Sequence, residues 1–335
     1  MGKVCKYILL TAMILTPYAR ILADSDFHKR EDVNDFISYM EKKHHYSKTE
    51  LTKIFSQVSS SQEIINKISK PAEGLTWDRY RKIFISDKRI KAGAKFWKEN
   101  LKLLEKAEAK YHVPADIIVS IIGVETFYGE MKGGYPVVQA LATLAFDYPR
   151  RAKFFRSELE AFLLLSKENN LDTLNLEGSY AGAIGIAQFM PSSYRAYARN
   201  FENKGSVDLI NNKAHAIASV GNYLREFGWK DNQEVIHKAY STSNKYQDIK
   251  APHHKPKPEY NLKALAQYNV FPQTKSLSSK DTFALIEFTN GQNNDLYLAQ
   301  NNFYVITRYN HSSNYALAVY QLAGAIKAEF NKLDS

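Results

Sequence analysis

The chain has 335 residues, of which 44% are hydrophobic, and its mean hydropathy of −0.41 is typical of a largely soluble protein. That length is enough for a sizeable core and two or three domains, and a single cysteine excludes a disulfide framework. The net charge of +10 suits an anionic polymer or an anionic membrane surface. Nucleic acid is disfavoured because no nucleic-acid-binding motif is present. Charge alone also fits a solvated surface without a specific partner.

Residues 1–23 differ in composition from the rest of the chain. Two lysines precede an apolar run at 7–16 that is too short to span a bilayer, and Ala19 and Ala23 follow it. This pattern predicts a secretory signal peptide, the alternative being an uncleaved anchor. Cys5 lies before the apolar run, where it is badly placed for lipoprotein processing. We therefore expect an exported, periplasmic protein that is soluble or only weakly associated with the envelope.

The first predicted elements of the mature chain are helices. Within 26–70, apolar residues recur at helical spacing, as they do at Val33, Phe36, Ile37 and Met40. Breakers follow at 71–76. One long helix is expected over about 90–111, and another is expected to begin between Pro114 and Asp116, because proline is tolerated in a first turn.

The helix that begins near Pro114 contains one carboxylate in an apolar run. Residues 117–126 read IIVSIIGVET, and Glu125 is their only charged residue. Apolar surroundings disfavour the anion, so we expect the pKa of Glu125 to be raised. A glutamic acid that stays protonated near neutrality can act as a general acid. The alternative is a helix-end glutamate that points into water.

The next stretch alternates predicted helices with loops rich in small residues. A loop is expected at 129–136, and the segment 176–191 is rich in glycine and alanine, which allow close backbone approach. Helices are expected over about 137–146, 149–170, from Pro191 onward, and over 213–228.

The composition changes after Trp229. Residues 250–259 are rich in proline and lysine and are typical of a surface loop, in which His253 and His254 are expected to face water. Strands are expected at FALIEF, LYLA and FYVITR within 282–308, because these segments are rich in β-branched and aromatic residues. Helical periodicity returns over 314–331. The chain is therefore predicted to be mainly helical with a small β unit inserted late.

Four segments, in this order along the chain, resemble the membrane-bound lytic murein transglycosylase B family. They are GVETFYG at 123–129, LATLAFDYPRRAKFF at 141–155, GSYAGAIGIAQFMPSSY at 178–194 and NFYVITRYNHSSNYALAVYQL at 302–322. The match extends from about Trp77 to the C-terminus and is less clear before it.

The resemblance implies an α+β, mainly helical fold with a lysozyme-like core. On that basis we expect a signal peptide at 1–23, a helical domain at 24–95, a lysozyme-like catalytic core at 96–235, a small β-containing insertion at 236–301 and a return to the core at 302–335. It also implies cleavage of peptidoglycan between N-acetylmuramic acid and N-acetylglucosamine, without water, leaving a 1,6-anhydromuramoyl end.

The catalytic glutamate of the family falls on Glu125. Most glycosidases need two carboxylates, but a substrate with an N-acetyl group can supply its own carbonyl oxygen instead of the second. We hypothesise that Glu125 protonates the leaving-group oxygen and then takes the proton of the C6 hydroxyl, which attacks within the same sugar.

The resemblance also implies substrate-binding residues. Arg150 and Arg151 match positions that contact acidic groups of the muropeptide, and because neighbouring side chains diverge, one of the two is expected to reach it. The remaining expected substrate contacts are Tyr80, Ser179, Gln188, Phe189, Met190, Tyr223, Tyr309, Asn310 and Tyr315. Core packing of the apolar residues and capping by Ser179 are the alternatives.

Two departures from the family are visible in the sequence. Some members carry an EF-hand-like calcium loop, but here residues 200–211 place Lys204 in a ligand slot and Asn211 where a bidentate glutamate belongs. We therefore predict no tight calcium site and expect no cofactor or other metal. The lipid-attachment cysteine is also missing.

Three functions remain open at this point. The leading one is a lytic transglycosylase acting on peptidoglycan glycan strands. A lysozyme-type muramidase with water as the acceptor, and a wall-binding protein without activity, are the alternatives. The sequence leaves the oligomeric state open.

Overall fold

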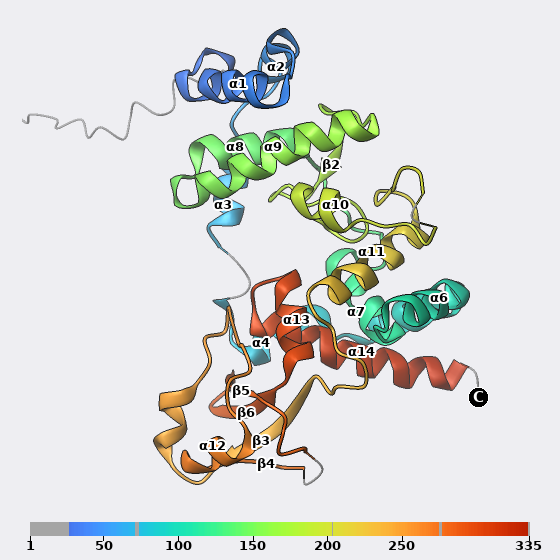
Figure 1. The fold of residues 1–335 in the computed structure, drawn as a ribbon, viewed down its shortest axis with the longest axis vertical. Helices are drawn as coiled ribbons and strands as arrows, with labels where there is room; N and C mark the ends of the chain where they lie inside the picture. The colour runs from blue at the N-terminus through green and yellow to red at the C-terminus, as the bar shows by residue number, and fades with distance from the viewer. Residues whose placement is uncertain (1–26, 71–73, 203, 275–276, 334–335) are drawn as a thin grey trace, which may run out of the picture. The chain divides into compact units, whose positions relative to one another are not determined.

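The computed structural model describes residues 27–70, 74–202, 204–274 and 277–333 (Figure 1). The predicted signal peptide lies outside the described residues. The chain divides into two compact units, one up to Ser60 and one from Ser61 onward. In the described ranges, none of the helices has the length and apolar character that crossing a bilayer requires.

From residue 27 onward, the first unit contains two helices, α1 (Glu31–His44) and α2 (Lys48–Phe55), after a short 3-10 turn, η2 (Phe27–Lys29). The helical spacing predicted here is confirmed, because all four of its apolar residues are buried in α1: Val33, Phe36, Ile37 and Met40. The ring of Phe36 meets that of Phe55 edge-on, with the ring centroids 6.1 Å apart. The two helices therefore pack through one apolar face each.

The second unit is mainly helical with two small antiparallel sheets. Its helices are α3 (Gln62–Ile68), α4 (Trp77–Phe84), α5 (Asp87–Glu99), α6 (Leu101–Tyr111), α7 (Ala115–Thr126), α8 (Val137–Asp147), α9 (Ala152–Asn169), α10 (Pro191–Tyr197), α11 (Lys213–Glu226), α12 (Leu262–Gln267), α13 (Asn301–Tyr309) and α14 (Ser313–Leu333), with 3-10 turns η4 (Pro149–Arg151) and η5 (Asn244–Ile249). Its strands are β1 (Tyr135–Pro136), β2 (Glu177–Gly178), β3 (Ile236–Ser241), β4 (Val270–Pro272), β5 (Ala284–Asn290) and β6 (Asn293–Ala299).

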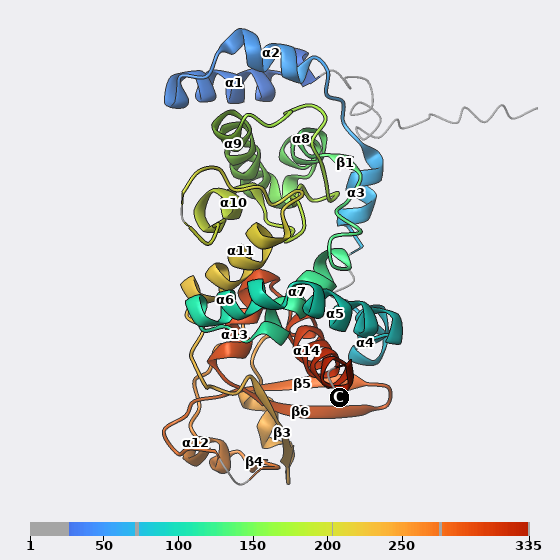
Figure 2. The same cartoon turned by 90° about the vertical axis from the view of Figure 1, so that its right-hand side faces the viewer.

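Helix α7 belongs to the helical core, where it packs against α14, α5, α11 and α6 (Figure 2). It begins at Ala115, as predicted, and ten of its 12 residues are buried. Its remaining residues, Asp116 and Glu125, are half-buried. A helix that is apolar on all sides is stable only inside a core, so the core fixes the position of Glu125.

The late β unit is a four-stranded sheet in the order β4-β3-β6-β5. The predicted strands at FALIEF and LYLA are confirmed as a hairpin of β5 and β6, and its turn contains Gly291 with a φ of 65°. The sheet and its neighbouring segments bury a small core of their own, which includes Leu265, Phe283 and Leu298. On the other side, Trp77 of α4 packs on Phe288 of β5, with ring centroids 5.8 Å apart.

Two sequence predictions about the elements are wrong. The single helix expected over 90–111 is interrupted at Asn100, where α5 ends and α6 begins; the side-chain amide of Asn100 donates to the carbonyl of Phe96 over 2.8 Å, a local bond that competes with the helix. The strand expected at FYVITR is helix α13. Its β-branched and aromatic residues favour a strand only weakly, and burial of Phe303 and Ile306 on one helical face overrides that preference. The mainly helical α+β fold itself is confirmed.

Candidate active site

Glu125 lies in the last turn of α7, and the chain turns sharply just after it. Phe127 and Tyr128 both adopt left-handed backbone conformations, with φ of 50° and 64°. Two successive non-glycine residues in this region are strained, and such strain persists only where the surroundings enforce it. The turn after Glu125 is therefore held by tertiary contacts.

Tyr128 provides the first of these contacts. Its hydroxyl donates to the carbonyl oxygen of Arg89 on α5 over 2.8 Å. Its ring fills space that Gly93 and Gly123 leave open, since a Cβ atom at either glycine would lie 2.5 or 2.6 Å from Tyr128. Burial raises the pKa of Tyr128 well above its usual value, so the hydroxyl remains a donor. The two glycines thus let one tyrosine lock α7 to α5.

Thr126 provides the second contact. Its hydroxyl donates to the carbonyl oxygen of Ile186 over 2.8 Å and accepts from the amide of Gly129 over 3.0 Å. Ile186 in turn donates its amide to the carbonyl of Leu209 over 2.7 Å. The end of α7 is therefore joined to the glycine- and alanine-rich segment and, through it, to the loop that precedes α11.

The carboxylate of Glu125 is held directly by Tyr315, from the first turn of α14. The Tyr315 hydroxyl donates to Oε1 of Glu125 over 2.6 Å, although the two residues are 190 positions apart in the chain. Tyr315 is 1% exposed. The ring of Tyr309 stacks on it with an interplanar angle of 8° and 6.4 Å between centroids.

Further aromatic residues pack around this pair. Tyr309 donates its hydroxyl to the carbonyl of Ala187, and Tyr223 donates its hydroxyl to the carbonyl of Arg308, each over 2.6 Å. Phe189 lies between them, with ring centroids 5.4 Å from Tyr223 and 5.7 Å from Tyr309. Helices α11, α13 and α14 and the glycine-rich segment therefore all contribute to one aromatic cluster.

These tyrosines are neutral hydrogen-bond donors. Burial raises the pKa of Tyr309 and Tyr315 well above the usual value, and the negative charge of Glu125 raises both further. Burial and, to a smaller degree, the same charge raise the pKa of Tyr223. Among the described residues, Glu125 is the one carboxylate whose charge acts on all three. The site combines one carboxylate with uncharged donors and aromatic rings.

The glycine- and alanine-rich segment places Ser179, Gln188 and Met190 at half-buried positions. The Ser179 oxygen accepts from the amides of Ala181 and Ala183, so it caps a turn while its hydroxyl hydrogen stays available for another acceptor. The Gln188 amide nitrogen donates to the carbonyls of Lys132 and Gly185, which fastens the loop expected at 129–136. A sugar contact by these residues stays a prediction.

Positive charges gather beside the aromatic cluster. Arg308 bonds the ring of His311 through its guanidinium at 2.5 Å. Burial lowers the pKa of His311, and the charges of Arg308, Arg151 and His254 lower it further. Arg151 also lies over the ring of Phe154, 4.3 Å from its centroid. Of the predicted arginine pair, Arg151 is thus the one whose charge acts on His311, and its guanidinium lies near the rings of Phe154 and Phe155.

The predicted site residues are therefore largely brought together. Glu125, Phe189, Tyr223, Tyr309 and Tyr315 form one cluster. Tyr80 is 1% exposed and packs against Trp77 and Phe84, with ring centroids 6.5 and 5.1 Å away, and Asn310 follows directly after Tyr309. Because Tyr80, Phe189, Tyr223 and Tyr315 are buried, their predicted contact with substrate stays a prediction.

Sequence reasoning missed the residues that position Glu125. Thr126 and Tyr128 belong to the segment at 123–129, and Arg308 and His311 belong to the segment at 302–322. The sequence alone assigned none of the four a role. Two glycines at helical positions, Gly93 and Gly123, were a readable signal of a close approach. The spacing of residues along the chain could not show that Tyr128 occupies the space beside these glycines.

The loop at 200–211 satisfies its own polar groups. The Asn200 side chain exchanges two hydrogen bonds with the backbone of Lys204, and Oδ1 of Asp208 accepts from the amides of Ile210 and Asn211. Glu202 pairs with Lys106 of α6 at 2.9 Å. Lys204 brings an ammonium group to a ligand position of the loop, and Asn211 lacks the bidentate carboxylate that closes such a site, so the absence of a tight calcium site stays a prediction.

Comparisons with known proteins agree with this geometry. Residues 28–324 match the family described as the transglycosylase SLT domain. The chain is 38% identical to membrane-bound lytic murein transglycosylase B of Escherichia coli over 90% of its length and 84% of that protein. An E. coli lytic transglycosylase solved with calcium is 37% identical with a TM-score of 0.82, the match covering 91% of this chain and 96% of that one.

A more distant solved structure is SltB3 of Pseudomonas aeruginosa in complex with NAG-anhNAM-pentapeptide. It is 26% identical with a TM-score of 0.74, and the match covers 89% of this chain and 79% of that one. Sequence, fold and the cluster around Glu125 thus agree, and the chain belongs to the SLT transglycosylase family and is a lytic transglycosylase.

Proposed function

We propose that this enzyme cleaves the β-1,4 bond between N-acetylmuramic acid and N-acetylglucosamine in peptidoglycan and leaves a 1,6-anhydromuramoyl end. The observation that carries the proposal is the carboxylate of Glu125, held by Tyr315; among the described residues it is the one carboxylate whose charge acts on Tyr223, Tyr309 and Tyr315 alike. Hydrolases of the two common types place a second carboxylate at the scissile bond. Binding of an anhydro-muropeptide by SltB3 supports the same product here.

In the first step, Glu125 donates its proton to the glycosidic oxygen as the bond to the anomeric carbon breaks. The carbonyl oxygen of the substrate's own N-acetyl group stabilises the positive charge at that carbon. The Tyr315 hydroxyl bonds Oε1 of Glu125 and stabilises the carboxylate that this step creates. The donor is already in place, so little reorganisation accompanies the charge development.

In the second step, the Glu125 carboxylate takes the proton of the C6 hydroxyl of the same muramoyl sugar. The C6 oxygen forms a bond to the anomeric carbon, which closes the anhydro ring and returns the proton to Glu125. The attack is intramolecular, and its effective concentration exceeds that of water. Arg151 and Arg308, beside the cluster, would bind carboxylates of the peptide stem.

The test is mass spectrometry of the products from purified sacculi. Products lighter than hydrolytic muropeptides by the mass of one water are expected. Glu125→Gln should lower turnover by about a hundredfold or more, because the amide can neither donate nor accept the transferred proton. Retained melting temperature shows that the variant is folded.

The other outcomes separate the alternatives. Full-mass reducing ends would make the chain a muramidase on the same fold. Near-normal turnover by Glu125→Gln would remove this residue from the mechanism. Binding of sacculi without any soluble product from the wild-type chain would indicate a wall-binding role.

The same proposal places the enzyme outside the cytoplasm, where its substrate lies. The signal-peptide pattern at residues 1–23 supports export, and the chain's positive net charge suits an anionic wall polymer. Detection of the protein in the periplasmic fraction of expressing cells would test this location.

A further inference from the structure

Three polar residues stand directly before Tyr315 at the start of α14, and all three are buried. Ser312 is 5% exposed, Ser313 is 0% exposed and Asn314 is 7% exposed. Buried polar groups are costly unless they are hydrogen-bonded, so the partners of these side chains and of their amides show what holds this turn. The proposed mechanism uses none of the three.

Ser312 and Asn314 fix the turn from two sides. The Ser312 hydroxyl oxygen accepts from the amide of Tyr315 over 3.3 Å, as an N-cap serine does. The side-chain amide of Asn314 donates to the carbonyl oxygen of Leu75, which precedes α4, over 2.9 Å. Both bonds restrict the backbone that carries the Tyr315 side chain.

Ser313 makes two bonds to one atom. Its amide and its hydroxyl both donate to the carbonyl oxygen of His253, each over 2.9 Å. A carbonyl oxygen has two lone pairs and can accept both bonds. The amide is one of the N–H groups at the start of a helix that have no partner within the helix. Because His253 is 60 positions away in the chain, Ser313 joins a distant loop to the turn that carries Tyr315.

The loop at 250–259, to which His253 belongs, is itself fixed on strand β5. The amide of Ala251 donates to the carbonyl oxygen of Leu285 over 2.8 Å. The ring of His253 meets that of Phe288 edge-on, with the ring centroids 5.6 Å apart. The four-stranded sheet therefore sets the position of the carbonyl that Ser313 binds.

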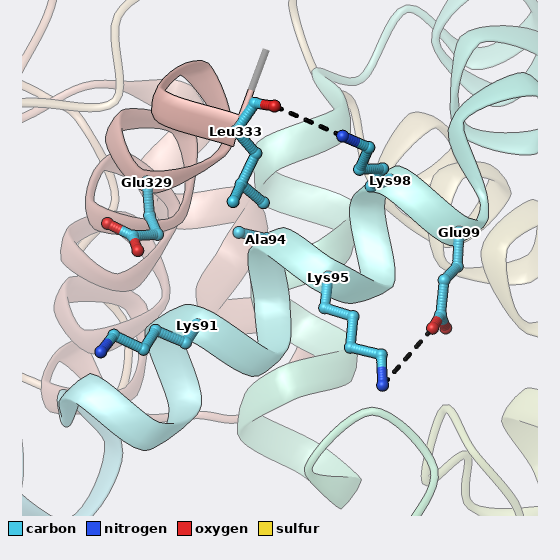
Figure 3. A pocket seen from close by; sticks show the side chains of 7 residues that line it. All are labelled: Lys91, Ala94, Lys95, Lys98, Glu99, Glu329 and Leu333. Carbon is cyan, nitrogen blue, oxygen red and sulfur yellow. Dashed lines mark hydrogen bonds and ion pairs between the residues drawn. The ribbon is translucent and has the colours of Figure 1, made fainter. Parts of the chain in front are cut away.

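Helix α14 is also held further along its length. The hydroxyl of Ser120 on α7 donates to the carbonyl of Val319 over 2.6 Å. At the far end, Lys98 of α5 donates to the carbonyl of Leu333 over 3.3 Å, beside a hollow that the two helices enclose (Figure 3). At 1.5 Å per residue, Leu333 lies about 27 Å along the helix from Tyr315. The contacts of α5 and α7 thus fix the helix as a whole, and the bonds of its first turn fix Tyr315.

We propose that Ser313 is a positioning residue for the reaction and that the loop at 250–259 acts on the active site through it. Ser313 ties the carbonyl of His253 to the turn that carries Tyr315, and the Tyr315 hydroxyl holds Oε1 of Glu125 over 2.6 Å. A donor stabilises a developing charge best when it is already in place. This role of Ser313 rests on the proposed function of Tyr315 as the donor to Glu125.

The experiment is a double-mutant cycle of Ser313→Ala and Tyr315→Phe in the full-length chain, measured by steady-state turnover of soluble muropeptides. Ser313→Ala removes the hydroxyl bond to His253 and keeps the amide bond. The control is Ser219→Ala, since the Ser219 hydroxyl is equally buried and exchanges two bonds with the backbone of Arg199. Kinetics are recorded well below the melting temperature of every variant, so that all of them are folded.

We expect Ser313→Ala to lower kcat about three- to tenfold with KM little changed, as is typical of the loss of one neutral hydrogen bond. In the Tyr315→Phe background it should have no further effect, because the hydroxyl that it positions is absent. Ser219→Ala should leave both constants unchanged. Hydrogen exchange over residues 250–256 should rise in Ser313→Ala and not in Ser219→Ala, because one of the two bonds between the loop and Ser313 is lost.

Equal falls of kcat in both backgrounds would overturn the proposal by showing that Ser313 acts independently of Tyr315. An unchanged kcat in Ser313→Ala, with Tyr315→Phe impaired, would also overturn it, and unchanged exchange in the loop would overturn the part of the loop. Full activity of Tyr315→Phe would instead refute the role of Tyr315 in the proposed function, and the role of Ser313 with it. The cycle therefore separates the two failures.

Discussion

The surroundings of Glu125 and the loop at 200–211 solve the problem of fixing a carboxylate in opposite ways. Glu125 is half-buried and is held by the neutral hydroxyl of Tyr315, which tertiary packing supplies from a distant part of the chain. Glu202 is exposed and pairs with the cation of Lys106, while Asn200 and Asp208 bond their own neighbours. A hydrogen bond from a neutral donor favours the carboxylate less strongly than a neighbouring cation does, so the carboxylate regains its proton more readily.

The two regions are nevertheless connected. Ile186 accepts a hydrogen bond from Thr126, next to Glu125, and donates its amide to Leu209 in the loop. Lys132, whose carbonyl accepts from Gln188, donates its ammonium group to the carbonyl of Ile210 over 2.8 Å. The loop is therefore a support of the site.

The largest effect that would test this comparison is on catalysis. Tyr315→Phe removes the neutral donor and leaves its ring, so we expect kcat to fall roughly ten- to hundredfold with KM little changed, as is typical of a hydrogen bond to a charged group. Steady-state kinetics on soluble muropeptides measures both constants. Tyr309→Phe, which removes a bond to a carbonyl only, is the matched control. A rise in KM at constant kcat would instead make Tyr315 a sugar contact.

A smaller effect is expected on stability when the contact between Tyr128 and Gly123, next to Glu125 in the fold, is disturbed. Gly123→Ala places a methyl group 2.6 Å from the Tyr128 ring and should lower the free energy of unfolding by about 1–3 kcal/mol. Urea denaturation measures the change. Gly324→Ala in α14 is the control, because its Cβ atom would meet nothing within 4 Å, and that helical substitution should be neutral or stabilising. Equal changes in the free energy of unfolding of the two variants would contradict the claim that Tyr128 needs a glycine at position 123.

Alkaline pH tests the neutral state of the tyrosines. Because folding raises the pKa of Tyr309 and Tyr315, their contribution to stability is complete below the unfolded pKa near 10 and is lost as pH rises from there through the folded pKa. Each should reduce the unfolding free energy by about 1.4 kcal/mol per pH unit above 10. Tyr315→Phe should therefore have the shallower slope. Parallel slopes in both proteins would show that Tyr315 ionises without unfolding.

The smallest effect concerns calcium. Because Lys204 stands at a ligand position of the loop and Asn211 replaces the bidentate glutamate, 1 mM Ca²⁺ and EDTA (roughly the range that separates weak extracellular sites from empty ones) should give the same melting temperature. Differential scanning calorimetry measures this. Micromolar binding of Ca²⁺ in titration calorimetry would contradict this prediction by showing that the loop at 200–211 binds the ion.

Local sequence signals predicted the elements well where burial and pattern agree. The start of α7, the β5–β6 hairpin and α14 follow from proline, turn residues and apolar periodicity. The prediction failed at Asn100, where one side-chain bond interrupts a helical pattern, and at FYVITR, where burial decides between two conformations. Both failures depend on interactions, one side-chain hydrogen bond and the burial of one helical face, that the periodic spacing of apolar residues does not reveal.

The site was predictable as a set of residues but not as a geometry. The apolar run around Glu125 made that residue a candidate general acid, with a water-facing glutamate as the alternative, and the family resemblance added Tyr315 and Tyr309 as candidate contacts. That Tyr315 bonds the carboxylate, while Gln188 bonds the backbone of Lys132, depends on contacts between distant segments. Such contacts are set by packing, which spacing along the chain cannot specify.

The contact of Tyr128 with Gly93 and Gly123 has a consequence for how this enzyme can diverge. A larger residue at Gly123 becomes acceptable only after position 128 has lost its ring, and at Gly93 it would in addition meet Ile326. A smaller residue at 128 leaves a void that the glycines cannot fill. The three positions should therefore be inherited together as one epistatic unit. Libraries that aim to alter the enzyme near Glu125 should vary these positions jointly or leave all three unchanged.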